Sequence, residues 1–152
     1  MGQDDTKHNL LFISKYPQII HEFTDAMKDR DIEIETAING IEAAAKIKKK
    51  NYDIVITGLS LEGYNGEQII TYLNKTAPST VCIIYTTTIS SAQLHFFINE
   101  RNVFRVFLRP VDFRGAFWEA LEEAYEYHAV QVKNEEDTGA RRQEQEKQER
   151  EI

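Results

Sequence analysis

The sequence predicts an α/β domain in which a parallel β-sheet is covered by helices on both faces. Short apolar runs rich in β-branched residues occur at residues 10–13, 32–36, 54–57, 81–85 and 103–108. Runs of this length and composition are typical of buried parallel strands. Segments with helical spacing separate them, and nothing repeats internally. Strands that alternate with helices of this length form right-handed βαβ units, so we expect one three-layer domain.

Each of the intervening segments carries apolar residues at the spacing of an amphipathic helix. Pro17 opens the first helix, where a missing backbone N–H costs nothing. Asp112 is the expected N-cap of the fifth helix. The residues expected to face the core are, helix by helix, Ile19, Ile20, Phe23 and Met27; Ile41, Ala44, Ala45 and Ile47; Ile69, Ile70 and Leu73; Leu94, Phe97 and Ile98; and Phe113, Phe117, Leu121, Ala124 and Tyr125.

The composition changes abruptly after about residue 132. We therefore predict a domain over residues 8–132 and a polar, charged tail over residues 133–152. The tail has almost no apolar side chain to offset its ordering entropy, so we expect it to be mobile or at most a frayed, solvated helix. No heptad pattern predicts a coiled coil. A partner-binding helix is the alternative interpretation of the tail.

Composition excludes several classes of function. A chain of 152 residues with 41% hydrophobic content is long enough for a single core. No run of 18 apolar residues predicts a membrane span, and no leader is visible, so we expect a cytoplasmic protein. A net charge of -7 argues against general nucleic-acid binding. The lone cysteine, Cys82, lies in an apolar run and is expected to be a small buried hydrophobe.

Specific signals for a metal or a cofactor are also missing. The histidines, His8, His21, His95 and His128, lie far apart, and none has a neighbour at metal-ligand spacing. We expect them to be surface or packing residues. No glycine-rich loop of the kinds that bind dinucleotides or nucleoside triphosphates is present. The sequence therefore predicts no metal site, no cofactor and no enzyme.

Four segments carry a resemblance to a known family. Residues 52–66 form a strand and a loop with several glycines, and Asn39-Gly40 precedes the second helix. Residues 81–87 form a strand that ends in hydroxyl residues, and residues 107–110 contain an Arg-Pro step. Together they resemble the receiver domains of bacterial response regulators, over about residues 8 to 130. The resemblance implies a flavodoxin-like fold, a doubly wound five-stranded parallel sheet in the order 2-1-3-4-5, and a cis bond at the Arg-Pro step.

The resemblance also identifies what the chain lacks. In that family, an acidic pair after the first strand holds a divalent metal, and an aspartate after the third strand accepts the phosphoryl group. A hydroxyl residue after the fourth strand and a Lys-Pro step after the fifth complete the site. The corresponding residues here are Ser14 and Lys15 for the acidic pair, Gly58 for the acceptor, Thr86 for the hydroxyl, and Arg109 with Pro110 for Lys-Pro.

These substitutions predict a receiver-like site without phosphochemistry. Glycine at position 58 supplies no nucleophile. A lysine about 5 Å from a divalent ion repels it by roughly 6 to 7 kcal/mol at an effective dielectric constant of about 20. Asp53 lies at the other end of the third strand, about 16 Å away, and cannot replace the missing carboxylate.

The sequence favours one function and leaves two alternatives, of which an unrecognised flavodoxin-like enzyme is the weaker because no residue supports it. The favoured function is a protein-interaction module. The resemblance implies a contact surface on the fourth helix, fifth strand and fifth helix, for another protein or a second copy of the chain. Its candidate residues are His95, Phe96, Asn99, Arg101, Arg105, Trp118 and Tyr127. The alternative is that the aromatic residues among them merely complete the core.

The second function is an anion or small-ligand sensor that uses the altered site. Lys15, Thr86 and Arg109 are its candidate ligand-binding residues, because cations beside helix N-termini favour an anion. The simpler interpretation is that Thr86 bonds to the backbone. Arg109 would then pair with an acid such as Glu62 or Asp112.

Overall fold

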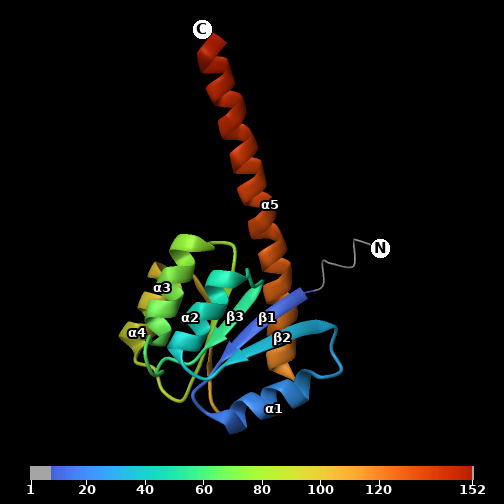
Figure 1. Cartoon of the computed structure of the whole chain (residues 1–152), viewed down its shortest axis with the longest axis vertical. Helices are drawn as coiled ribbons and strands as arrows, with labels where there is room; N and C mark the ends of the chain where they lie inside the picture. Colours follow the sequence, from blue (N-terminus) through green and yellow to red (C-terminus); the bar gives the residue numbers. More distant parts are fainter. Residues whose placement is uncertain (1–7, 152) are drawn as a thin grey trace.

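The computed structural model describes the backbone of residues 8–151 and the side chains of residues 8–136. The elements follow the order β1 (His8–Ile13), α1 (Pro17–Met27), β2 (Ile32–Ala37), α2 (Gly40–Lys49), β3 (Ile54–Thr57), α3 (Gly66–Thr76), β4 (Val81–Thr86), α4 (Ser91–Glu100), β5 (Val103–Leu108) and α5 (Ala116–Glu151). The strands pair in parallel to form a 5-stranded sheet in the order β2-β1-β3-β4-β5 (Figure 1). The predicted strand order is thus confirmed.

The core has two halves because successive strand residues point to opposite faces of the sheet. Leu10 and Phe12 of β1 belong to the cluster beneath α1 and α5. Leu11 and Ile13 belong to the cluster beneath α2, α3 and α4. Both faces are therefore covered, and the carboxyl ends of the strands stay open to the loops that carry the altered receiver motifs.

Four residues that were predicted to face the core lie on the surface instead. Ile41 is 63% exposed, Leu94 41% and Ile98 40%, and Ala45 is exposed as well. In α2 the buried stripe consists of Gly40, Ala43 and Ile47, so Ile41 projects outward. In α4 only Phe97 is buried, because this helix lies over β5 at the edge of the sheet and meets little of the core.

The last helix differs from its predicted bounds at both ends. Residues 113–115 form a turn that Asp112 stabilises, since its carboxylate accepts a hydrogen bond from the backbone N–H of Arg114 at 3.0 Å. The helix then runs without a break from Ala116 to Glu151, so the backbone of residues 133–151 is helical. The far end of α5 projects from the domain on the side where the amino ends of the strands lie (Figure 1). None of the described helices has the length and apolar character that a membrane span needs.

Candidate functional site

The carboxyl ends of four neighbouring strands bring the predicted site residues together. We call this site the cleft and define it by Ser14, Lys15, Gly58, Thr86 and Arg109. The backbone N–H of Gly58 donates to the carbonyl of Ile13 at 3.1 Å, which joins the ends of β3 and β1. The backbone N–H of Arg109 donates to the carbonyl of Thr86 at 2.8 Å, which joins the ends of β5 and β4.

Gly58 occupies the acceptor position without being required by the backbone there. A Cβ atom at this position would lie 3.7 Å from the carbonyl oxygen of Tyr85 and 4.0 Å from that of Ile13, which are ordinary contact distances. Gly66 is different, because a Cβ atom there would lie 2.2 Å from the carbonyl oxygen of Gly58. The loop therefore needs glycine at position 66, whereas position 58 has room for a Cβ atom but holds no nucleophile.

The two positions of the acidic pair carry a turn-forming serine and a cation. Ser14 is buried, and its hydroxyl oxygen accepts a hydrogen bond from the backbone N–H of Tyr16 at 3.2 Å. This bond stabilises the turn that leads into α1. The exposed ammonium group of Lys15 donates to the hydroxyl of Ser60 at 3.3 Å. Neither side chain supplies the carboxylate oxygen that a divalent cation prefers.

A tyrosine ring holds two cations at the cleft. The ammonium nitrogen of Lys15 lies 5.3 Å from the ring centroid of Tyr16, and the guanidinium carbon of Arg109 lies 4.6 Å from the same centroid. Both distances are within the range of cation–π attraction. Arg109 also lies 6.0 Å from the ring of Tyr85. Burial raises the pKa of Tyr85, against the opposing effect of the charge on Arg109.

The ion pair considered for Arg109 does not form. Within residues 8–136, the arginines paired with carboxylates include Arg105 and Arg114, but Arg109 makes no ion pair with Glu62 or Asp112. Its aromatic neighbours take the place of a carboxylate.

The remaining cleft residues follow their expected local geometry. The hydroxyl of Thr86 donates to the backbone carbonyl of Thr88 at 3.2 Å, which is the simpler of the two roles considered for it. The Arg109-Pro110 peptide bond is cis, as predicted. The order of strands and the backbone bonds at their ends thus bring these residues to one end of the sheet.

Comparison with known proteins decides the family. Residues 11–115 match the response regulator receiver domain family. The chain belongs to this family. No curated protein sequence matches the chain.

Solved structures show that the receiver fold extends over most of the chain. The signal receiver domain of an HD domain-containing protein from Pseudomonas fluorescens Pf-5 superimposes with a TM-score of 0.76 at 19% identity, covering 82% of this chain and 98% of that one. A CheY-like receiver domain from Methanospirillum hungatei JF-1 gives a TM-score of 0.74 at 18% identity, covering 82% and 99%. An adenylate cyclase structure from Rhodopirellula baltica gives 0.79 at 19% identity, covering 88% and 98%.

Several residues predicted for the receiver's contact surface make hydrogen bonds or ion pairs within the domain. The guanidinium of Arg101 donates to the hydroxyl of Thr71 in α3 at 3.2 Å and lies 4.7 Å from the ring of Phe96. The amide of Asn99 donates to a carbonyl of its own helix at 3.0 Å. Arg105 pairs with Glu123 of α5 at 2.8 Å. His95 is exposed.

The placement of Trp118 on this contact surface was wrong. Its ring lies 4.3 Å from the guanidinium of Arg30, beside Asp31 and Ile32 at the α1 and β2 side of the molecule. Trp118 follows the buried Phe117, and one residue corresponds to about 100° around a helix. The helix therefore turns Trp118 away from β5. Tyr127 does lie next to β5, where its ring stacks on Phe104 at 5.1 Å.

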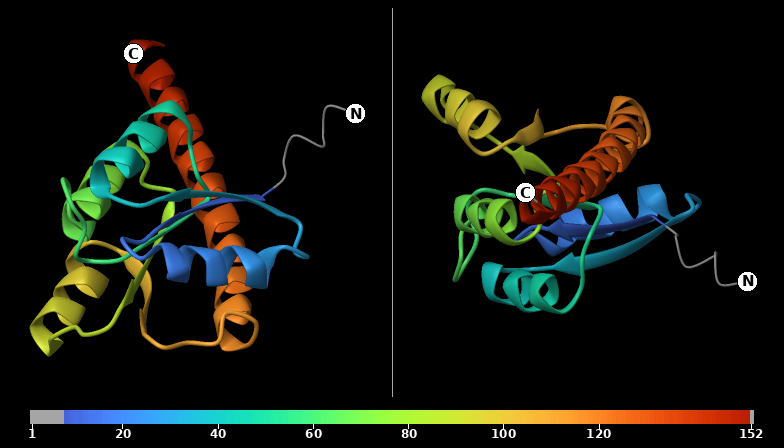
Figure 2. Two further views of the ribbon diagram at one scale, coloured as in Figure 1. Left: turned by 60° about the horizontal axis from the view of Figure 1, so that its bottom comes forward. Right: turned by 90° about the horizontal axis from the view of Figure 1, so that it is seen from above.

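The surface instead exposes aliphatic residues that the sequence reading had assigned to the core or overlooked. We define the α4–β5–α5 face by the exposed apolar side chains on these three elements. Its members are Leu94 and Ile98 of α4, Leu108 of β5, and Tyr127 and Val130 of α5. The ribbons of α4 (yellow) and α5 (orange to red) can be followed in Figure 2. A signal was present in α4, because a helix with apolar residues at positions 94, 96, 97 and 98 has more than one side to bury.

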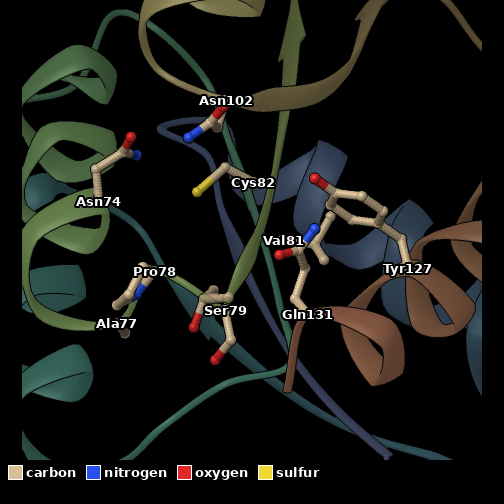
Figure 3. A pocket seen from close by; sticks show the side chains of 10 residues that line it. Asn74, Ala77, Pro78, Ser79, Val81, Cys82, Asn102, Tyr127 and Gln131 are labelled. Carbon is tan, nitrogen blue, oxygen red and sulfur yellow. The ribbon is translucent and has the colours of Figure 1, made fainter. Parts of the chain in front are cut away.

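A group of two histidines with Asp53 and a cavity lie at the opposite end of the sheet, where the strands begin. His8 and His128 both approach Asp53, a grouping that their separation in the sequence concealed. The described part of the chain contains no group of His, Cys, Asp or Glu residues that could hold a metal ion. A cavity of about 190 Å³ lies nearby, between Asn74, Ser79, Asn102 and the α5 residues Tyr127 and Gln131 (Figure 3).

Proposed function

We propose that this receiver domain is a non-phosphorylatable protein-interaction module of cytoplasmic two-component or phosphorelay signalling, with no catalytic activity of its own. The single observation that carries the proposal is Gly58 at the acceptor position. A glycine there leaves nothing to form an aspartyl phosphate, although the surrounding backbone has room for a side chain.

The charge of the cleft supports the same proposal. Lys15 and Arg109 are both present, and the acidic pair is replaced. A lysine about 5 Å from a divalent ion opposes its binding by roughly 6 to 7 kcal/mol at an effective dielectric constant of about 20. Receiver phosphorylation depends on such a metal to neutralise the phosphoryl oxygens. Loss of the nucleophile and repulsion of the metal therefore act together.

The α4–β5–α5 face supports an output through protein contact. Leu94 and Ile98 are four residues apart in a helix, so they lie on the same side of α4. Leu108 adds a further exposed apolar side chain on the edge strand β5. Exposed apolar patches of this kind are typical of surfaces that bind other proteins. The partner is a protein, a second copy of this chain included, rather than nucleic acid, which the net charge of -7 disfavours.

Exposure to a phosphoryl mimic or to a phosphoryl donor tests whether the chain can be phosphorylated. Adding Mg²⁺ with beryllium fluoride, or Mg²⁺ with acetyl phosphate, is expected to leave the mass and the backbone amide chemical shifts of the chain unchanged. A receiver that retains its acidic residues serves as the positive control for both reagents. Saturable, Mg²⁺-dependent shifts at Gly58 and Thr86 would contradict the proposal.

A surface variant tests the interaction face. Replacing Leu94 and Ile98 together by lysine is expected to leave the melting temperature nearly unchanged and to abolish self-association or partner retention. The measurements are sedimentation velocity and affinity capture. Ile41→Lys is the matched control, since Ile41 is 63% exposed on α2 and lies outside the face. Equal binding by the double variant and the control would contradict the assignment of the face.

A second candidate function is an anion or small-ligand sensor, and one observation favours it. Lys15 and Arg109 approach the same tyrosine ring, and within residues 8–136 neither forms an ion pair with a carboxylate. Thr86 lies beside them at the end of β4. Two cations without opposing carboxylates favour a bound anion such as phosphate or an organic acid.

Ligand-dependent stability tests the sensor. Millimolar sulfate or phosphate is expected to raise the free energy of unfolding by about 1 kcal/mol where the ligand exceeds its dissociation constant a few-fold. Lys15→Ala and Arg109→Ala should each remove this gain, whereas Lys48→Ala on α2 should retain it. A gain that survives both cleft substitutions would exclude the sensor and leave the interaction module.

A further inference from the structure

An ionic network fastens α5 to the end of the sheet that lies opposite the cleft. Asp53 precedes β3, and its carboxylate accepts a hydrogen bond from the backbone N–H of Asn9 at 3.2 Å. The side-chain oxygen of Asn9 accepts in return from the backbone N–H of Asp53 at 2.6 Å. Nε2 of His128 in α5 lies 3.1 Å from the carboxylate, and Nδ1 of His8 in β1 lies 3.6 Å from it.

Both ring nitrogens of His128 face groups that can only accept a hydrogen bond. Nε2 faces the carboxylate of Asp53, and Nδ1 lies 2.9 Å from the backbone carbonyl of Ser79 in the α3–β4 loop. A neutral imidazole has one N–H and can satisfy only one of these acceptors. The protonated ring has two and satisfies both. The geometry therefore selects the imidazolium form.

The surroundings of the two groups agree with this assignment. The hydrogen bond to Asp53 raises the pKa of His128 above its ordinary value, against an opposing effect of burial and with help from Ser79 and from the charges of Asp53 and Glu135. Burial acts to raise the pKa of Asp53, but the hydrogen bonds from His128 and Asn9 and the charges of both histidines lower it overall. These directions favour the ionised carboxylate and the protonated imidazole.

The position of His128 in α5 explains why its bonds to Asp53 and Ser79 matter for the attachment of this helix. The buried residues of α5 end at Tyr125, whose hydroxyl donates to the carbonyl of Asn9 at 3.0 Å and whose ring stacks on His8 at 4.2 Å. Within residues 8–136, His128 is the last residue of α5 with a side-chain bond to the rest of the domain, and its side chain is only 18% exposed. Beyond it the helix leaves the domain (Figure 1).

We propose that His128 is a proton-dependent latch that holds α5 against the amino end of the sheet through Asp53 and Ser79. Loss of one proton leaves one N–H for two acceptors, so one of the two bonds is lost and a nitrogen lone pair then faces an acceptor oxygen. The part of α5 after Tyr125 then loosens. This part carries Tyr127 and Gln131, which form one wall of the cavity in Figure 3, with Ser79 across from them.

The latch couples pH to the position of the projecting helix, and with it to the Tyr127 and Val130 portion of the α4–β5–α5 face. It works whether or not the cleft accepts a phosphoryl group. Its failure would therefore leave the proposed function intact, and the reverse holds as well.

Hydrogen exchange and ring NMR on the full chain test the latch. Protection factors of α5 amides at residues 126–136 are expected to fall by roughly threefold or more from about pH 6 to about pH 8.5, while those at residues 117–124 stay constant. The ring of His128 should titrate above the ordinary value of 6.5. In His128→Gln the pH dependence of protection should vanish, and His95→Gln is the matched control that should retain it.

Asp53→Asn provides an independent arm that keeps the histidine. Replacing the charged acceptor by an amide should move the titration of His128 to lower pH and move the loss of protection with it. A wild-type ring that titrates at or below 6.5 would overturn the proposal. A protection profile that is the same in His128→Gln as in the wild type would overturn it as well.

Discussion

Restoring the acceptor alone should not restore a working receiver, and Gly58→Asp is the perturbation that shows it. The new Cβ would meet only carbonyl oxygens at 3.7 and 4.0 Å, so the substitution fits without a backbone shift. We expect the free energy of unfolding to stay within about 1 kcal/mol of the wild-type value, as for substitutions that cause no clash. Any failure to bind metal must then come from charge and not from misfolding.

The electrostatic balance predicts that failure. At equal distance, one carboxylate attracts a divalent ion about as strongly as Lys15 repels it, roughly 6 to 7 kcal/mol at about 5 Å and an effective dielectric constant of about 20. Arg109, which lies across the Tyr16 ring system, adds further repulsion. The single aspartate is therefore neutralised by the cations before a metal arrives.

The decisive comparison is with a variant that also restores the acidic pair. Ser14→Asp, Lys15→Asp and Gly58→Asp together remove the repulsion and supply three carboxylates. An aspartate at position 14 can still accept the backbone N–H of Tyr16 that the serine accepts now. Mg²⁺ titrations followed by amide chemical shifts should show saturable binding by the triple variant and none by Gly58→Asp. Equal binding by both variants would refute the charge argument.

Two further predictions concern the last helix and its latch. Removing residues 133–152 should leave the melting temperature within a few degrees of the full chain, because among the described side chains of residues 8–136 every buried core residue precedes residue 126; a larger drop would mean that the tail packs on the domain. In the pH profile of stability from denaturant titrations, the raised pKa of His128 contributes stability that is complete below 6.5 and is lost as pH rises through the folded-state pKa. The lowered pKa of Asp53 contributes stability that is complete above 3.8 and is lost as pH falls through its folded-state pKa. His128→Gln should flatten the alkaline side, and an unchanged profile there would contradict the linkage.

The fold was predictable because its determinants are local runs in the sequence. Each strand is a short apolar segment between helical ones, and the cis Arg109-Pro110 bond came from a recognisable step. Amphipathic faces were predictable only where a helix lies fully on the sheet. In α3, Ile69, Ile70 and Leu73 are buried as expected, whereas α4 at the sheet edge buries Phe97 and leaves Leu94 exposed.

The site was predictable in position but not in its contacts. Strand order alone brings Lys15 and Arg109 to the same end of the sheet, but their common neighbour Tyr16 depends on side-chain directions that no spacing encodes. The latch was hidden for a related reason. His128 and Asp53 lie far apart in the sequence and meet only because α5 returns across the amino ends of β1 and β3.

Gly58 and Gly66, at the two ends of the connection between β3 and α3, separate what the fold requires from what the chemistry requires. Gly66 cannot carry a side chain, because a Cβ atom would lie 2.2 Å from the carbonyl oxygen of Gly58. Gly58 can, because its nearest neighbours lie at ordinary contact distance. Packing therefore imposes glycine at position 66 and leaves position 58 free to carry a Cβ atom, so the receiver fold does not depend on whether position 58 holds a nucleophile. Fold and phosphochemistry are independent properties of this loop. A receiver scaffold can therefore keep its contact surfaces while its cleft carries cationic side chains in place of carboxylates.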